Sequence, residues 1–114
     1  MKNEEIYLAA SSEDSKISGV LEHDGETMYF YLYDASAVDG NRVIGAIHIW
    51  DGPFDTEQHP VNIQFSANND FIGLYIDKVL WAVFGISQGL TCGGNYFEKQ
   101  VPAIPTDVVR KFNH

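Results

Sequence analysis

Three short apolar runs, separated only by turn residues, follow one another between His59 and Gly89. Residues 61–66 alternate between apolar and polar side chains, the period of two that places one face of a strand in a core and the other in water. The runs at 71–76 and 80–86 also have strand length, and only a few residues connect each run to the next. The sequence therefore predicts an antiparallel meander over this stretch.

Two pairs of turn residues indicate hairpins. Asp77-Lys78 lies between the second and third runs and can close a tight hairpin. Asp24-Gly25 lies between two apolar alternations in the first half of the chain, and this pair is a strong hairpin signal because the turn needs positive φ. We expect a two-residue turn there, with Gly25 at positive φ.

Strand patterns recur before the meander and fade after it. Further strands are expected at 5–10, 17–23, 27–33 and 43–50. A loop is expected at 35–42, centred on Asp39-Gly40-Asn41. The stretch after Gly89 contains two adjacent glycines and two prolines and is predicted to be irregular, up to a short helix at 105–112.

These patterns predict an all-β fold. We expect an antiparallel meander of about six to eight strands that forms a sandwich or a partly open barrel, with one short C-terminal helix. The length of 114 residues suits a single domain over 1–114, large enough for one core without a metal or disulfide.

The net negative charge is confined to one half of the chain. Residues 1–57 hold 12 acidic and 3 basic residues, which accounts for the whole net charge of −9, whereas residues 58–114 hold four of each. Such a field disfavours nucleic acid and anionic membranes and favours a basic protein partner. The alternative is an acidic surface that only keeps the protein soluble.

The sequence favours a cytoplasmic setting. Glu4 and Glu5 occupy the place where a secretory signal would carry basic residues and then about 7 to 15 apolar ones. No apolar run approaches the roughly 18 residues of a membrane helix. Cys92 is the single cysteine, so no intrachain disulfide can form.

Cys92 is the first candidate for chemistry. It lies beside glycines whose backbone amides can hold an anion near a thiolate, but no histidine lies close to it in sequence to act as a base. The alternative is a partly buried small residue in a turn. We expect no catalytic residues, and the double glycine lacks the lysine and helix of a phosphate-binding loop.

The histidines are candidates for a metal site. His48 with Asp51, and His23 with Asp24, are local pairs, but their spacing matches no ligand signature. We expect His48 on the same strand face as the neighbouring Trp50, and the aspartates in turn roles. Neither a metal nor another cofactor is predicted.

An aromatic stripe is the strongest candidate for a binding surface. Tyr29, Tyr31 and Tyr33 alternate with Met28, Phe30 and Leu32. If the second set points into the core, the tyrosines line an outer surface, and exposed tyrosine is enriched at interfaces. If the strand is central and covered on both faces, the tyrosines are structural. The candidate carboxylates beside the stripe are Glu22, Glu26 and Asp34.

Residues 60–97 resemble a small family of uncharacterised bacterial proteins, a domain of unknown function. The matching positions are Phe65-Ser66, Leu74, Ile76-Asp77 and Ala82-Val83-Phe84. The resemblance implies a bacterial origin and one compact domain. It brings no activity with it, and the N-terminal half shows no such likeness.

Taken together, the residues favour a non-enzymatic intracellular protein that binds another macromolecule through its acidic half. An inhibitor-like or immunity-like role fits the small size, the acidity and the absence of a catalytic pattern. The alternative is a small-ligand binder or an enzyme with a pocket near Cys92 and Trp81. In a regular strand, we expect Trp81 to share a face with Val83. A flat acidic aromatic face would favour the first function and a concave apolar pocket the second.

Overall fold

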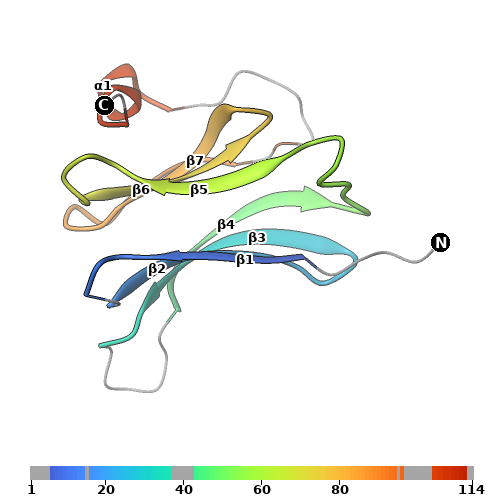
Figure 1. Ribbon diagram of the computed structural model, residues 1–114, viewed down its shortest axis with the longest axis horizontal. Helices are drawn as coiled ribbons and strands as arrows, with labels where there is room; N and C mark the ends of the chain where they lie inside the picture. The colour runs from blue at the N-terminus through green and yellow to red at the C-terminus, as the bar shows by residue number, and fades with distance from the viewer. Residues whose placement is uncertain (1–5, 15, 37–42, 95, 97–103, 113–114) are drawn as a thin grey trace.

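Two four-stranded antiparallel sheets face one another in the computed structural model, which describes residues 6–14, 16–36, 43–94, 96 and 104–112 (Figure 1). The N-terminal sheet contains β1 (Ile6–Ser11), β2 (Ile17–His23), β3 (Thr27–Asp34) and β4 (Val43–Asp51). The C-terminal sheet contains β5 (Val61–Phe65), β6 (Phe71–Ile76), β7 (Val79–Gly85) and β8 (Leu90–Gly93). Helix α1 (Thr106–Arg110) follows.

Each sheet is a simple meander, and the two stack strand over strand. Neighbouring strands pair antiparallel in the order of the sequence, and across the sandwich β1 lies against β5, β2 against β6 and β4 against β8. The prediction of an all-β antiparallel fold with a short C-terminal helix is confirmed. The sheets stay separate, so of the two predicted architectures the chain adopts the sandwich.

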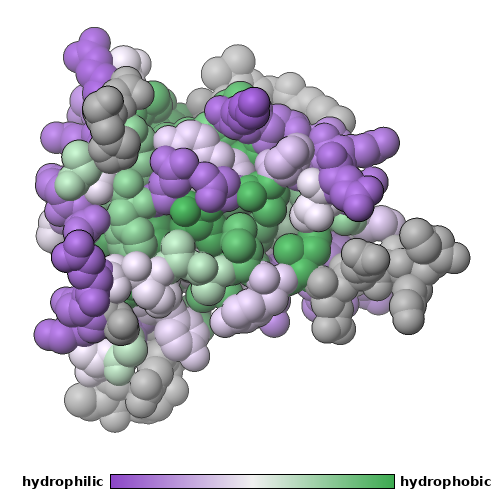
Figure 2. All heavy atoms as spheres, in the orientation of Figure 1, coloured by the Kyte–Doolittle hydropathy of each residue, from purple (hydrophilic) through white to green (hydrophobic). Residues whose placement is uncertain are grey.

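The core fills the space between the sheets. Apart from the consecutive pair Trp81 and Ala82, its buried side chains come from alternate positions of the facing strands, as a period of two requires. The N-terminal sheet contributes Leu21, Met28, Phe30, Leu32, Ile47 and Ile49, and the C-terminal sheet Ile63, Ile72, Leu74, Ile76, Trp81, Ala82 and Phe84. In Figure 2, where the β1 and β5 edges face the viewer, apolar side chains gather between the sheets and hydrophilic ones flank them.

A second, smaller cluster lies on the outer face of the C-terminal sheet. Val108 and Phe112, at and just beyond α1, pack against Phe71, Leu80 and Val83. The helix therefore covers this outer face, as Figure 1 shows.

Strand β8 corrects the prediction of irregular structure after Gly89. Its four residues pair with β7, from Gly85 opposite Leu90 to Ala82 opposite Gly93. A Cβ on Gly93 would lie 2.0 Å from the Trp81 carbonyl oxygen, so the close approach needs glycine. So short a strand carries no alternation, and pairing with β7 rather than a local pattern creates it.

Two β-bulges separate each tryptophan from the residue that was expected to share its face. In β4 the pairing with β3 shifts by one residue, so that His48 faces outward while Trp50 packs against the core. In β7 a similar shift turns Trp81 into the core and leaves Val83 on the outer face. The expectations that His48 shares a face with Trp50, and Trp81 with Val83, were therefore wrong.

The predicted hairpins form, with one change of turn type. Asp77 and Lys78 have φ of 56° and 68°, as a tight two-residue turn requires. Gly25 has φ of 100°, as predicted, but three residues rather than two separate β2 from β3. The Asp24 carboxylate accepts hydrogen bonds from the Glu26 and Thr27 amides at 2.9 and 2.8 Å and stabilises this longer turn. Most of the predicted loop at 35–42 lies outside the described residues.

Replacing Gly25 by valine tests the turn. We expect Gly25→Val to lower the free energy of unfolding by about 1–3 kcal/mol, because a β-branched residue resists positive φ. Glu26→Val in the same turn is the control, since Glu26 has an ordinary negative φ, and it should change stability less. Chemical denaturation measures both variants. Equal stability of the two variants would contradict the assigned turn.

Candidate binding face

The outer face of the N-terminal sheet carries the tyrosine stripe, and no described helix or strand covers it. We call this surface the tyrosine face. Its members are Tyr7, Ala9 and Ser11 from β1, Ser18, Val20 and Glu22 from β2, Tyr29, Tyr31 and Tyr33 from β3, and Val43, Ala46 and His48 from β4.

Strict alternation in β3 places the tyrosines on this face. Met28, Phe30 and Leu32 are buried in the core, so the intervening residues point outward. Tyr29 and Tyr31 are half-buried by their neighbours on the sheet, and Tyr33 is 39% exposed. The sequence predicted outward tyrosines on the condition that Met28, Phe30 and Leu32 face the core, and this condition is met.

A groove of about 660 Å³ runs over the tyrosine face. Small side chains on β1 and β2, such as Ala9, Ser11 and Ser18, line it, and larger side chains on β3 stand beside them. Tyr7 is the most exposed large hydrophobic side chain of the face, at 71%. Tyr7 could not be found from the sequence, because only the register of β1 on β2 brings it opposite Glu22.

The rings and the carboxylate on this face interact electrostatically. Tyr29 and Tyr31 stack with ring centroids 5.8 Å apart and planes at 16°. Partial burial, together with the nearby Glu22 carboxylate, raises the pKa of Tyr31. The Tyr31 phenol thus stays neutral at physiological pH and offers both a hydrogen-bond donor and an acceptor.

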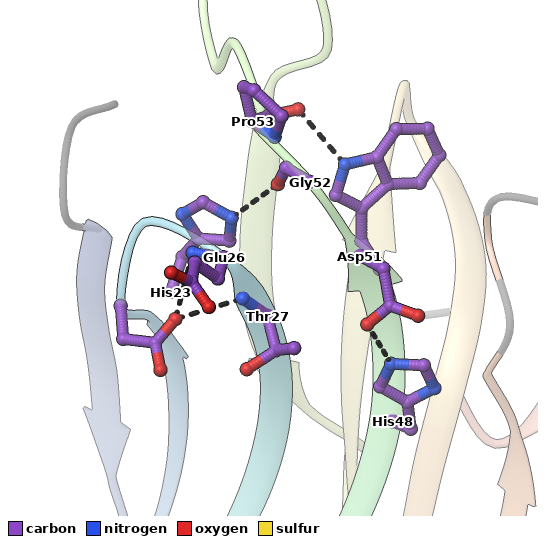
Figure 3. Close-up of polar contacts among 9 residues, drawn as sticks. His23, Glu26, Thr27, His48, Asp51, Gly52 and Pro53 are labelled. Carbon is purple, nitrogen blue, oxygen red and sulfur yellow. Dashed lines mark hydrogen bonds and ion pairs between the residues drawn. The ribbon is translucent and has the colours of Figure 1, made fainter. Parts of the chain in front are cut away.

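Acidic side chains gather where the tyrosine face borders the β2–β3 turn, with Glu22 on the face itself and Asp24, Glu26 and Asp51 beside it. Figure 3 shows this region, where the His48 ring meets the Asp51 carboxylate at 2.8 Å. Asp24 is engaged with the turn amides, which lowers the pKa of its carboxyl group. The carboxylates of Glu22 and Glu26 make no hydrogen bond or ion pair with any described residue.

The opposite end of the face is electrically more balanced. Asp34 accepts hydrogen bonds from the Ser36 amide and hydroxyl at 2.9 and 2.6 Å, which lowers the pKa of its carboxyl group. Lys16, in the β1–β2 turn, is the only lysine or arginine among the described residues of the N-terminal sheet and its turns. Of the three predicted carboxylates, only Glu22 therefore lies on the face itself. Glu26 lies in the turn, and Asp34 is bound to its own loop.

A second polar cluster, missed in the sequence, joins three distant segments. The Tyr96 hydroxyl donates a hydrogen bond to Asp77 at 2.6 Å, and His59 Nδ1 lies 3.0 Å from the same carboxylate oxygen and 3.1 Å from the Tyr96 hydroxyl. Trp50 and Trp81 pack on the Tyr96 ring, with centroids 5.8 and 5.0 Å away.

This cluster has a structural role. Burial and the bond to Asp77 raise the pKa of Tyr96 to about 12, so the phenol does not serve as a base near neutral pH. No local sequence signal links the three residues, because their contacts span 18 to 37 positions along the chain.

The remaining candidates for chemistry have structural surroundings. Cys92 packs with the cluster beneath α1, whereas Trp81 belongs to the core between the sheets. Buried His23 donates from Nε2 to the Gly52 carbonyl at 2.7 Å and accepts the Gly25 amide at Nδ1. In the described part of the chain, no three His, Cys, Asp or Glu side chains gather closely enough to hold a metal ion.

Alkylation kinetics test the environment of Cys92. Burial and the nearby Asp107 carboxylate raise the pKa of the thiol, so we expect it to react with iodoacetamide no faster than an unstructured cysteine. Asp107→Asn should speed the reaction slightly by removing the negative charge. Rapid labelling of the wild type near pH 6 would contradict this expectation and indicate an activated thiolate.

The pH dependence of stability tests the Tyr96 cluster. Because folding raises the Tyr96 pKa from about 10 to about 12, its stabilisation is complete below pH 10 and disappears as pH rises through 12. We expect Tyr96→Phe to lower the free energy of unfolding by about 1–3 kcal/mol at pH 7. The difference between wild type and variant should shrink between pH 10 and 12 in denaturant titrations. A constant difference over that range would contradict the assignment.

Comparisons with known proteins extend the likeness seen in the sequence. The model of a family described as an uncharacterized protein conserved in bacteria (DUF2251) matches residues 1–105, so the match includes the N-terminal half, where the sequence showed no likeness. No curated protein and no solved structure matches the chain. None of the helices in the described residues has the length and apolar character to cross a membrane. The predicted family resemblance is confirmed, and the chain belongs to this family of uncharacterised bacterial proteins.

Proposed function

We propose that this protein binds a basic protein partner through its tyrosine face and performs no catalysis. The observation that carries the proposal is Glu22, which lies between tyrosines on the outer sheet face. Among the described residues, its carboxylate has no ion-pair partner and no helix or strand covers this face. The proposed setting is the bacterial cytoplasm, which the single cysteine favours.

The composition of the face supports recognition of a macromolecule. Tyrosine offers a large apolar ring and a polar hydroxyl at low cost in conformational entropy, and it is enriched at interfaces. The groove extends over all four strands of the sheet, which suits a protein segment better than a small enclosed ligand.

The charge distribution supports a basic partner. Acidic side chains gather at the β2–β3 turn, and the described residues of the N-terminal sheet at that end include no lysine or arginine. A field of one sign attracts a partner of the opposite sign and accelerates its association. An inhibitor-like or immunity-like role would use such a surface to cover a basic protein.

Association kinetics test the proposal. A protein captured from a lysate of a bacterium that carries this family is purified, and its binding is measured at about 0.05 and 0.5 M salt. We expect the on-rate to fall roughly tenfold as salt rises. Glu22→Lys with Glu26→Lys should slow association, whereas Tyr33→Ala should mainly raise the off-rate.

The matched control reverses two exposed carboxylates elsewhere, with Glu57→Lys and Asp107→Lys. This pair changes the net charge by the same amount. The on-rate of the control variant should nevertheless stay much higher than that of the variant with Glu22→Lys and Glu26→Lys. An on-rate independent of salt, or an interface mapped only to residues 58–114, would show that the acidic half is a solubilising surface.

A further inference from the structure

We infer that the partner presents an arginine side chain to Glu22, from an extended segment that lies along the groove of the tyrosine face. This inference rests on the proposed function and adds to it the residue type that the face recognises. It is argued from the surroundings of Glu22, the roles of the neighbouring carboxylates and the length of the groove.

Glu22 occupies the centre of an aromatic row. Across the sheet, it pairs directly with Tyr7 on β1 and with Tyr29 on β3. Tyr31 lies diagonally beside it, close enough for the Glu22 charge to affect its pKa. A cation bound at Glu22 would therefore meet phenol rings on both sides of the carboxylate.

A guanidinium group fits these surroundings better than an ammonium group does. It forms two parallel hydrogen bonds with a carboxylate, and its planar, weakly hydrated surface stacks on aromatic rings. Tyrosine faces also attract cations through the ring quadrupole. An ammonium group gains the charge attraction but loses the paired hydrogen bonds and the stacking.

The other carboxylates near the face are less suited to this contact. Asp24 is bound to the amides of its turn, Asp51 to His48, and Asp34 to Ser36. Glu26 has no such bond, but it belongs to the turn and is not among the residues that line the groove. Glu22 is the acidic side chain that lines the groove.

The groove sets the form of the rest of the ligand. It reaches from Tyr7 and Glu22 to Ser11 and Ser18, a distance of four residue steps, or about 13 Å along the strands. The lining beyond Glu22 is uncharged, and its β1 and β2 side chains are small except for Val20. An extended segment with an arginine followed by about three small neutral residues would therefore fill the groove.

A peptide titration tests the inference. The probe is a capped heptapeptide with a central arginine and Ser-Val-Ser on either side. The arginine can therefore reach Glu22 whichever way the peptide runs along the groove. The peptide is titrated into the isotopically labelled protein, and the chemical shifts of the protein are followed by NMR. We expect shifts centred on Glu22, Tyr7, Tyr29 and Tyr31, and binding several-fold tighter than for matched lysine and citrulline peptides.

Two variants with equal loss of charge separate local contact from general attraction. Glu22→Gln should weaken binding of the arginine peptide by about fivefold. Glu13→Gln removes a carboxylate from the β1–β2 turn at the far end of the sheet and should weaken binding less than twofold, as distant exposed charges are screened. Both positions are exposed, so both variants should keep the wild-type spectrum away from the substitution.

The outcomes distinguish this inference from the proposed function. Equal affinity for the arginine and lysine peptides, equal effects of the two variants, or no shifts on the face would overturn the arginine assignment. If, in that case, Glu22→Lys with Glu26→Lys still slows association of the captured partner, the proposed function stands. If the partner binds outside the tyrosine face, both fall.

Discussion

Burial of alternate side chains between two sheets is the constraint on which the rest of the structure depends. Neither meander has another cover for its inner apolar face, so each must pack on the other. A shift of one residue in the register of β3 would send Phe30 to the surface, and the same shift in β6 would expose Leu74. Each exposed side chain would cost about 1.5–3 kcal/mol. The core thereby determines which residues point outward.

The two outer faces differ because the described residues cover only one of them. On the C-terminal sheet, α1 places Val108 and Phe112 over an apolar surface and turns it into a second small core. The outer face of the N-terminal sheet instead carries hydroxyls, a carboxylate and half-buried rings, which remain compatible with water. The tyrosine face can thus stay uncovered in the free protein and still offer aromatic area to a partner.

Local periodicity was enough to predict most strands, both main hairpins and the outward direction of the tyrosines. It failed wherever a contact between distant residues decided the structure. Strand β8 depends on pairing with β7, and Tyr7 reaches the tyrosine face only through the register of β1. Tyr96 finds Asp77 through folding of the whole chain. The turn at Gly25 was recognised, but its length depended on the side-chain bonds of Asp24.

The bulges in β4 and β7 give these two strands a tolerance that a regular strand lacks. Near its tryptophan each strand has one residue with no partner opposite it, Ile49 in β4 and Trp81 in β7, and this extra residue turns Trp50 or Trp81 toward Tyr96. Loss of one residue there would restore plain alternation while the rest of the strand kept its facing. A deletion within β3 would instead exchange its tyrosines with its core residues. A one-residue deletion at either bulge therefore costs mainly the aromatic packing around Tyr96, whereas one in β3 exchanges the two faces of the strand.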